Sequence, residues 1–385
     1  QAEIVIVINA ADITKNKVRY DLGITYDLDV LRLIHVFTDR GLYVSSVVIT
    51  RYVDTPAIQQ FKHKLEKLGL KVYRHYEIDG YPSNIPLIVS DEGYGKNDYN
   101  ETTRPLVVVT APGPGSGKMA TCLSQLYHEN KRGVKAGYAK FETFPIWNLP
   151  LKHPVNLAYE AATADLNDVN MIDPFHLEAY GKTTVNYNRD VEIYPVLSAI
   201  FEGIFGKCPY KSPTDMGVNM AGLCIFDDEA CREASCQEII RRYYQALEKV
   251  VKDDSCQNEA YKIELIMKQA KISPKDRVVV PAAVNLAKET DAPAAALELP
   301  DGKIVLGKTK ELLGASAAVL LNAVKELGGI DHSIDLISPE SIAPIQELKV
   351  RYLGSGNPRL HTDEVLIALS TCAATDENAR IALEQ

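Results

Sequence analysis

The sequence predicts an α/β protein whose N-terminal domain has a mostly parallel sheet with helices on both faces, in three layers. Two observations support this fold class. Short, continuous apolar runs such as residues 4–8 and 106–109 are typical of strands that are buried on both faces. Amphipathic runs with helical spacing alternate with these strands, as in residues 55–68.

The first domain is predicted to span residues 1–153. Its apolar runs predict strands at residues 4–8, 43–49, 71–76, 86–89 and 106–109. Its helical patterns predict helices at residues 27–38, 55–68 and 118–129. Gly69 follows the second of these patterns and is expected to end that helix.

The pattern changes after residue 153. Residues 154–272 are predicted to form a mainly helical domain, with helices at 155–164, 191–204, 227–251 and 258–269. Residues 273–385 are predicted to form a small α/β domain. We expect a strand at 277–280, a hairpin of strands 294–299 and 303–306, and helices at 310–327 and 362–372.

Composition excludes several classes of protein. The 385 residues are 46% hydrophobic and 24% charged, which is typical of globular domains and not of disordered chains. The net charge of −9 disfavours nucleic-acid binding as the main function, because phosphate backbones require a basic surface. No run approaches the roughly 20 apolar residues of a membrane span.

The cysteine pattern and the first residues indicate the cellular compartment in which the protein is expected. Seven cysteines without a Cys-x-x-Cys pair predict reduced thiols in a cytoplasmic protein. The spacing of Cys224, Cys231, Cys236 and Cys256 fits no standard pair of zinc ligands. The chain begins at Gln1, without a methionine or a basic segment, so we expect it to start within a longer native sequence.

The clearest local motif runs from the strand at 106–109 through a Gly-rich turn to Lys118. Gly113, Gly115, Ser116 and Gly117 precede this lysine, which opens the predicted helix 118–129. Glycines allow backbone N–H groups to turn toward an anion, and a helix N-terminus adds partial positive charge. The segment therefore predicts a phosphate-binding, P-loop-like domain. Met119 occupies the place of the Ser or Thr that binds magnesium in a strict P-loop. An ordinary strand-to-helix turn is the alternative.

A second motif follows the predicted strand 86–89. Asp91 and Glu92 come directly after it, as in a Walker B element, where an Asp holds magnesium and a Glu orients water. We therefore predict Asp91 as a metal ligand and both residues as catalytic. A polar strand end with a tight turn is the alternative.

Cationic side chains in two other segments complete the predicted site. Lys17 and Arg19 follow the first strand, and ligands of open α/β sheets bind beyond the carboxyl ends of strands. Arg359 lies in a Gly-rich loop of the third domain, which is also able to hold an anion. We predict all three as ligand-binding residues; the loop around Arg359 is equally well explained as the lead into a capped helix.

At these motifs the chain resembles a bacterial protein family of unknown function with a P-loop-like N-terminal domain. The resemblance spans the chain and rests on residues 16–19, 21–27, 90–96, 110–118, 140–147 and 357–364. It implies a multidomain protein and assigns no reaction. Some relatives carry an ATP-dependent peptidase label, whereas no H-E-x-x-H, G-x-S-x-G or S-x-x-K motif occurs in this chain.

The sequence therefore predicts a cytoplasmic protein that binds a nucleotide, with Mg²⁺, or another phosphorylated metabolite. Phosphoryl or nucleotidyl chemistry is one expectation. A non-catalytic ligand-binding or scaffold protein, and a sugar-phosphate or nucleotide-sugar transferase, are the alternatives. The 20 tyrosines and the wide apolar faces of the middle domain also predict a homo-oligomer, since Tyr is enriched in interfaces.

Overall fold

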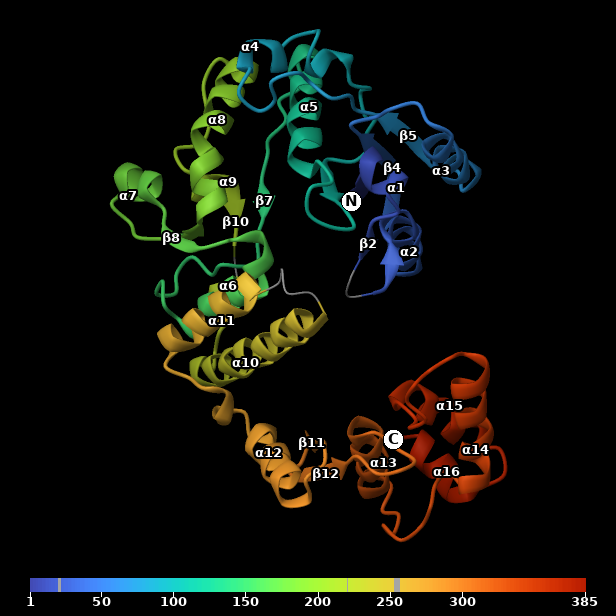
Figure 1. The fold of residues 1–385 in the computed structure, drawn as a ribbon. Coiled ribbons are helices and arrows are strands. Elements are labelled where there is room, and N and C mark those ends of the chain that lie inside the picture. The colour runs from blue at the N-terminus through green and yellow to red at the C-terminus, as the bar shows by residue number, and fades with distance from the viewer. Residues whose placement is uncertain (20–21, 220, 253–256) are drawn as a thin grey trace. The chain divides into compact units, whose positions relative to one another are not determined.

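The computed structural model describes residues 1–19, 22–219, 221–252 and 257–385 (Figure 1). It divides into two compact units. Unit one comprises Gln1–Leu151 and Asn167–Phe226, and unit two comprises Lys152–Leu166 and Asp227–Gln385. The predicted boundary at residue 153 lies near the first of these divisions, whereas the predicted middle domain, 154–272, contributes residues to both units.

Unit one contains the predicted parallel sheet. Its four strands are β1 (Ala2–Asn9), β4 (Tyr43–Thr50), β5 (Lys71–Arg74) and β6 (Leu106–Thr110), in the order β5-β4-β1-β6 and all parallel. By position in the chain this order is 3-2-1-4, so it reverses between β1 and β6. Ligands of open parallel sheets bind where the strand order reverses. The α/β prediction is confirmed.

Helices cover both faces of this sheet. The helices α1 (Ala10–Thr14), α2 (Tyr26–Asp39) and α3 (Pro56–Lys67) share an apolar core with one face of β1 and β4. The helix α5 (Lys118–Lys131) lies on the other side of the sheet (Figure 1). The strands β2 (Val18–Arg19) and β3 (Ile24–Thr25) form a separate antiparallel pair between β1 and α2 in the chain.

The predicted strand at residues 86–89 is wrong. The segment forms a short helix, α4 (Ile85–Ile88), and a 3-10 turn follows at Tyr94–Lys96. Ile88 is fully buried in a core with residues of α5 and of the helix α8 (Asn188–Phe205). The periodicity of a short apolar run does not distinguish a strand from a helix. Here the packing against two helices favours the helical conformation.

The remainder of unit one follows α5. The strand β7 (Lys140–Phe141) pairs with β10 (Gly217–Val218), and β8 (Asn170–Ile172) pairs with β9 (Val185–Tyr187). The connecting helices are α7 (Pro174–Tyr180), α8 and α9 (Pro213–Met216), with a 3-10 turn at Ala221–Leu223.

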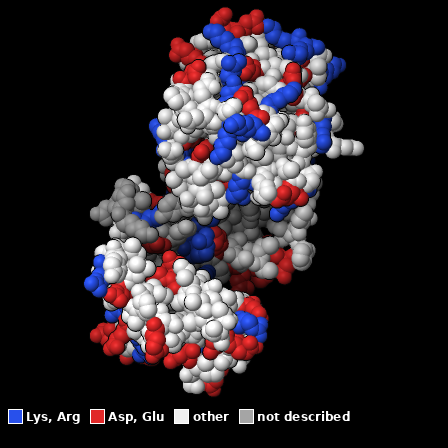
Figure 2. Space-filling view, turned by 90° about the vertical axis from the view of Figure 1, so that its right-hand side faces the viewer, with Lys and Arg blue, Asp and Glu red and all other residues white. Residues whose placement is uncertain are grey.

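On the face of the molecule in Figure 2, Lys and Arg side chains are interspersed with Asp and Glu side chains.

Unit two begins with three helices that share one core: α6 (Pro154–Ala162), α10 (Asp228–Lys252) and α11 (Gln257–Ala270), with a 3-10 turn at Ala164–Leu166. The predicted hairpin is confirmed as β11 (Ala294–Glu298) and β12 (Ile304–Lys308). The predicted strand at 277–280 is wrong, because a 3-10 turn at Pro274–Asp276 leads into the helix α12 (Val279–Thr290).

The C-terminal part of unit two is mainly helical. Its elements are α13 (Ala315–Leu327), α14 (Pro339–Glu347), a π-helical turn at Leu348–Tyr352, α15 (Thr362–Cys372) and α16 (Glu377–Leu383). Buried side chains of α13, α14, α15 and α16 share one apolar core. Among the described residues of both units, no helix is long and apolar enough to cross a membrane.

Candidate functional site

The Gly-rich loop, residues 111–117, connects β6 to α5 and is fixed to the ends of two neighbouring strands. Asn9, the last residue of β1, donates from Nδ2 to the carbonyl oxygen of Gly115 at 3.4 Å. Thr50, the last residue of β4, donates from Oγ1 to the carbonyl oxygen of Ser116 at 2.7 Å. The loop therefore lies at the carboxyl edge of the sheet, as the sequence predicted, and the strand order reverses at the same place.

The glycines of this loop have conformations and contacts that a larger residue would disturb. Gly115 and Gly117 have φ angles of +78° and +94°, in the left-handed region. A Cβ atom on Gly113 would lie 2.3 Å from the hydroxyl of Tyr26. Ser116 is 1% exposed, and its hydroxyl donates to the carbonyl oxygen of Gly113 at 2.9 Å. That hydroxyl therefore stabilises the loop and does not replace the missing magnesium ligand.

Lys118 is the first residue of the 14-residue helix α5. The N-cap is Gly117, which has no side chain to cap the first N–H groups of the helix. The Lys118 ammonium group donates to the carbonyl oxygen of Gly113 at 3.4 Å. The side chain is exposed, yet desolvation by the surrounding protein lowers the pKa of Lys118, and the positive charge of Lys140 lowers it further. A helix N-terminus and the exposed Lys118 ammonium group favour a negative ligand here.

Lys17 lies near the same loop, whereas Arg19 has a different role. The Lys17 ammonium group lies 4.6 Å from the ring centroid of Tyr26, whose hydroxyl faces Gly113, and 3.5 Å from Oδ1 of Asp12. Arg19 donates to the fully buried carboxylate of Asp29 at 2.9 Å. Lys17 therefore remains a candidate ligand, while the Arg19 contact stabilises the start of α2.

Tyr20 and Asp21 lie outside the described residues, as does Cys256 of the cysteine group considered above.

Asp91 lies at the opposite end of α5 from Lys118, which corrects the predicted shared site. The hydroxyl of Tyr127 donates to Asp91 Oδ1 at 2.8 Å, and Lys131 forms an ion pair with the same atom. The bond from Lys131, followed by that from Tyr127, lowers the pKa of Asp91. Lys131 is the last residue of α5 and Lys118 the first, so 13 steps of about 1.5 Å separate them by roughly 20 Å.

A magnesium ion that bridged Asp91 to a phosphate at Lys118 would need a carboxylate oxygen of Asp91 and a phosphate oxygen, each about 2 Å from the ion. Asp91 therefore cannot hold such a metal, and Glu92, which pairs with Lys96 at 2.8 Å, does not reach the loop either. The physical reason is that the preceding apolar run is the helix α4 and not a strand of the sheet. Among the described residues, no group of three or more His, Cys, Asp or Glu side chains is arranged to hold a metal.

Arg359 belongs to unit two, and its contacts lie within that unit. Its guanidinium Nε donates to the carbonyl oxygen of Lys310 at 2.7 Å. Its own carbonyl oxygen accepts from the ammonium group of Lys349 at 2.7 Å. The binding role predicted for Arg359 stays a prediction.

A group of charged residues near Lys118 was not predicted as part of the site. Lys140 on β7 contacts the hydroxyl of Tyr187 and the carboxylate of Asp190, and lies 2.6 Å from Oε1 of Glu142. We call Lys140, Glu142, Tyr187 and Asp190 the Lys140 cluster. The signal in the sequence was Lys140-Phe141-Glu142, because charges two residues apart on a strand lie on the same face.

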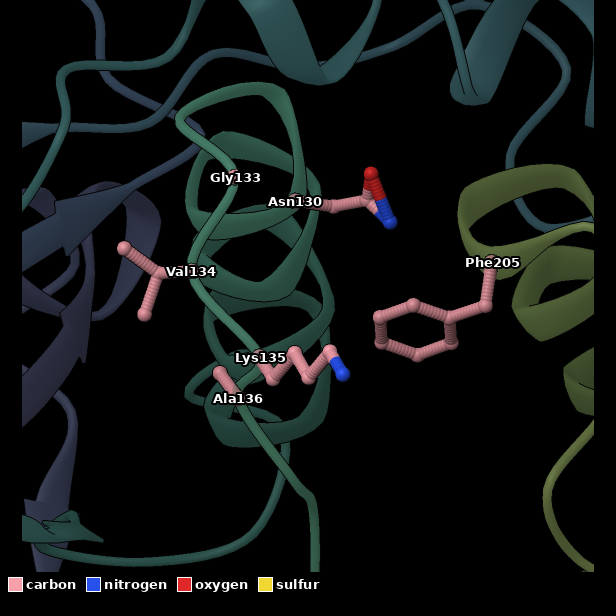
Figure 3. Close-up of a pocket in the computed structure, with 6 residues that line it drawn as sticks. All are labelled: Asn130, Gly133, Val134, Lys135, Ala136 and Phe205. Carbon is pink, nitrogen blue, oxygen red and sulfur yellow. The ribbon is translucent and has the colours of Figure 1, made fainter.

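A separate cavity of about 230 Å³ lies near the C-terminal end of α5. It is lined by Asn130, Gly133, Val134, Lys135, Ala136 and Phe205, and the side chains of Lys135 and Phe205 approach the same space in Figure 3. Ligand pockets usually measure about 300–1,000 Å³. The cavity is smaller than that, and it lies at the opposite end of α5 from the Gly-rich loop.

The fold and the loop together define an α/β protein with a candidate anion site at the edge of a parallel sheet. Comparison with known proteins identifies the family. Residues 1–271 match the model described as "Domain of unknown function DUF1846, N-terminal", and residues 275–385 match its C-terminal counterpart. The chain belongs to this DUF1846 family, and the resemblance to a bacterial family of unknown function is confirmed.

Curated bacterial relatives support this assignment. The chain is 61% identical over 384 residues to the UPF0371 protein cu0538 of Corynebacterium urealyticum, covering 100% of this chain and 77% of the relative. It is 60% identical over 385 residues to the UPF0371 protein stu1377 of Streptococcus thermophilus, covering 100% and 78%. The names of these relatives state no activity. The boundary between the two matched models, at residues 271–275, is close to the predicted boundary at residue 272.

Proposed function

We propose that this protein binds the phosphate group of a nucleotide or of another phosphorylated metabolite at the Gly-rich loop. The observation that carries the proposal is the position of Lys118. It opens an uncapped helix directly after a loop that Asn9 and Thr50 hold at the reversal of strand order. Backbone N–H groups, the helix dipole and an ammonium group then meet at one point, as in known phosphate sites.

We propose binding without NTP hydrolysis. The position after Lys118 holds Met119, which lacks the magnesium-binding hydroxyl of a strict P-loop. The carboxylate of Asp91 contacts Tyr127 and Lys131, which are nine and 13 residues after Lys118 and lie in the C-terminal half of α5. A magnesium-dependent nucleotide hydrolase would need other metal ligands. A ligand held by its phosphate and by protein cations fits the described residues better.

The test is a calorimetric titration of the wild-type protein and of Lys118→Ala with inorganic phosphate, pyrophosphate and ATP, each with and without magnesium. Loss of a charge-assisted contact of about 1.5–3 kcal/mol should raise Kd by about 10- to 150-fold. Lys67→Ala is the matched control, because Lys67 is also an exposed lysine of a sheet-covering helix but lies in the last turn of α3. The proposal is wrong if wild-type protein binds none of these ligands, or if Lys118→Ala binds all of them equally well.

A further inference from the structure

The Lys140 cluster brings one ammonium group and two carboxyl groups together in unit one. Lys140 and Glu142 are two residues apart and extend from the same face of the chain, while Asp190 lies in the first turn of α8. The side chains of Glu142 and Asp190 are only 6% and 13% exposed. Three ionisable groups are thus held in contact and largely removed from water.

The cluster holds more negative charge than a structural ion pair needs. One carboxylate would neutralise Lys140. Among the described residues, the ion pairs of both Glu142 and Asp190 are with Lys140 alone. Two buried carboxyl groups that share one cation disfavour each other's ionisation, which raises the pKa of one of them. Pairs of carboxyl groups in this situation serve as proton donors or acceptors in enzymes.

The cluster lies close to the Gly-rich loop. The charge of Lys140 acts on Lys118, the residue that opens α5. Tyr138, two residues before Lys140, and Met119, the residue after Lys118, pack against one apolar core. A phosphate held at the loop would therefore have the cluster as its neighbour.

Resting on the proposed function, we infer that Glu142 is the acid–base residue of the Gly-rich-loop site. It transfers a proton to or from an oxygen atom of the bound phosphorylated ligand. In the forward direction the O–H bond of the Glu142 carboxyl group breaks, and an O–H bond forms on the ligand oxygen. The resulting Glu142 carboxylate is stabilised by the ammonium group of Lys140, and the reverse transfer restores the acid.

The surroundings of Glu142 support this role. Burial raises the pKa of Glu142 to about 7, with a contribution from the negative charge of Asp190 and opposition from Lys140. Burial lowers the pKa of Lys140, but Asp190 and Glu142 outweigh it and raise the value, so Lys140 stays charged. The ionisable groups around Glu142 are Lys140 on β7, Tyr187 on β9, Asp190 on α8, Tyr138 before β7, and Lys118 and Cys122 on α5. Burial raises the pKa values of Tyr138, Tyr187 and Cys122, so these three groups stay neutral near pH 7.

The test is a pH titration by NMR of protein labelled with ¹³C at the glutamate carboxyl carbons, with and without inorganic phosphate. A carboxyl signal that is lost in Glu142→Gln should titrate near neutral pH. A bound phosphate dianion disfavours the charged carboxylate, so saturating phosphate should raise this midpoint by about one pH unit. The matched control is Glu101→Gln, because Glu101 is an exposed carboxylate of unit one that pairs with Lys71. Glu101→Gln should remove a different carboxyl signal and leave the Glu142 titration unchanged, both with and without phosphate.

The outcomes separate this inference from the proposed function. Labelled backbone amides of Gly115 and Gly117 report phosphate binding in the same samples. If these amides respond while the Glu142 midpoint stays constant, Glu142 is not part of the site, although the loop binds phosphate. If neither responds, both proposals are wrong. If Glu142→Gln does not fold, Asp190→Asn identifies the signal instead, because removing the neighbouring charge should move the Glu142 midpoint to lower pH.

Discussion

Replacing Gly117 by alanine should both destabilise unit one and disturb the loop. The φ angle of +94° is in a region that costs L-residues about 1–2 kcal/mol. The new Cβ would also lie 2.9 Å from Cγ2 and 3.0 Å from Oγ1 of Thr50, the residue that holds the loop to β4. Overpacking of this kind costs about 1–3 kcal/mol. The sum predicts that Gly117→Ala lowers the free energy of unfolding by about 2–5 kcal/mol.

Two other glycines provide controls that separate these contributions. Gly115 has a φ of +78°, but a Cβ atom added there would meet no other atom within 4 Å. Gly115→Ala should therefore cost only the backbone strain of about 1–2 kcal/mol. Gly137 has neither a positive φ nor a close neighbour. Gly137→Ala should be neutral, or stabilising by up to about 1 kcal/mol through the unfolded state.

The assay is urea unfolding followed by the fluorescence of Trp147, the single tryptophan of the chain, which lies in unit one. The order of stability should be Gly137→Ala, then Gly115→Ala, then Gly117→Ala. If Gly117→Ala is as stable as Gly115→Ala, the close packing of the loop against Thr50 is refuted.

The remaining predictions concern four other features of the chain. Asp91→Asn should leave the affinity for phosphate unchanged in calorimetry, because Asp91 lies at the far end of α5; a change of tenfold or more would restore the shared site. Glu3→Ala should lower the free energy of unfolding by about 1–3 kcal/mol in urea titrations, since the buried carboxylate accepts from the N–H groups of Thr103 and Arg104. Because the folded-state pKa of Glu142 is raised from 4.5 to about 7, the native state binds more protons than the unfolded state between these values. The free energy of unfolding should therefore fall as pH rises through this window, and Glu142→Gln should flatten the slope in urea titrations at several pH values. The predicted homo-oligomer should give a mass above 42.5 kDa in light scattering, and a monomer mass at every concentration would contradict it.

The sequence predicted the sheet of unit one because its strands are strongly patterned. Residues 4–8 are a continuous apolar run that is buried in the central strand β1. Residues 106–109 form the edge strand β6, in which Leu106 and Val108 remain exposed. The Gly-rich loop was also found, because glycine spacing and a following lysine are local features. The strand predicted at residues 86–89 failed because its burial depends on α5 and α8, which lie far away in the sequence.

That error also misplaced part of the candidate site. A strand ending at Asp91 would have reached the carboxyl edge of the sheet, whereas α4 leaves Asp91 beside Lys131. At the Lys140 cluster the sequence analysis failed in the other way, because it did not predict residues that the structure brings together. Lys140-Phe141-Glu142 is a local pattern, but Asp190 is 48 positions after Glu142, since 190 minus 142 is 48, and nothing in either segment indicates the other. Only the folded chain brings them to one ammonium group, so their pairing was not predictable from local patterns.

The most direct test of the phosphate site uses the anomalous X-ray scattering of selenate, a dianion with the shape of phosphate. Crystals of the wild-type protein and of Lys118→Ala would be soaked under identical conditions. The account predicts a selenium peak at the Gly-rich loop, placed so that the selenate oxygen atoms accept from the first N–H groups of α5 and from the Lys118 ammonium group, and no such peak in Lys118→Ala. Selenium peaks elsewhere on the wild-type protein with none at the Gly-rich loop would contradict it.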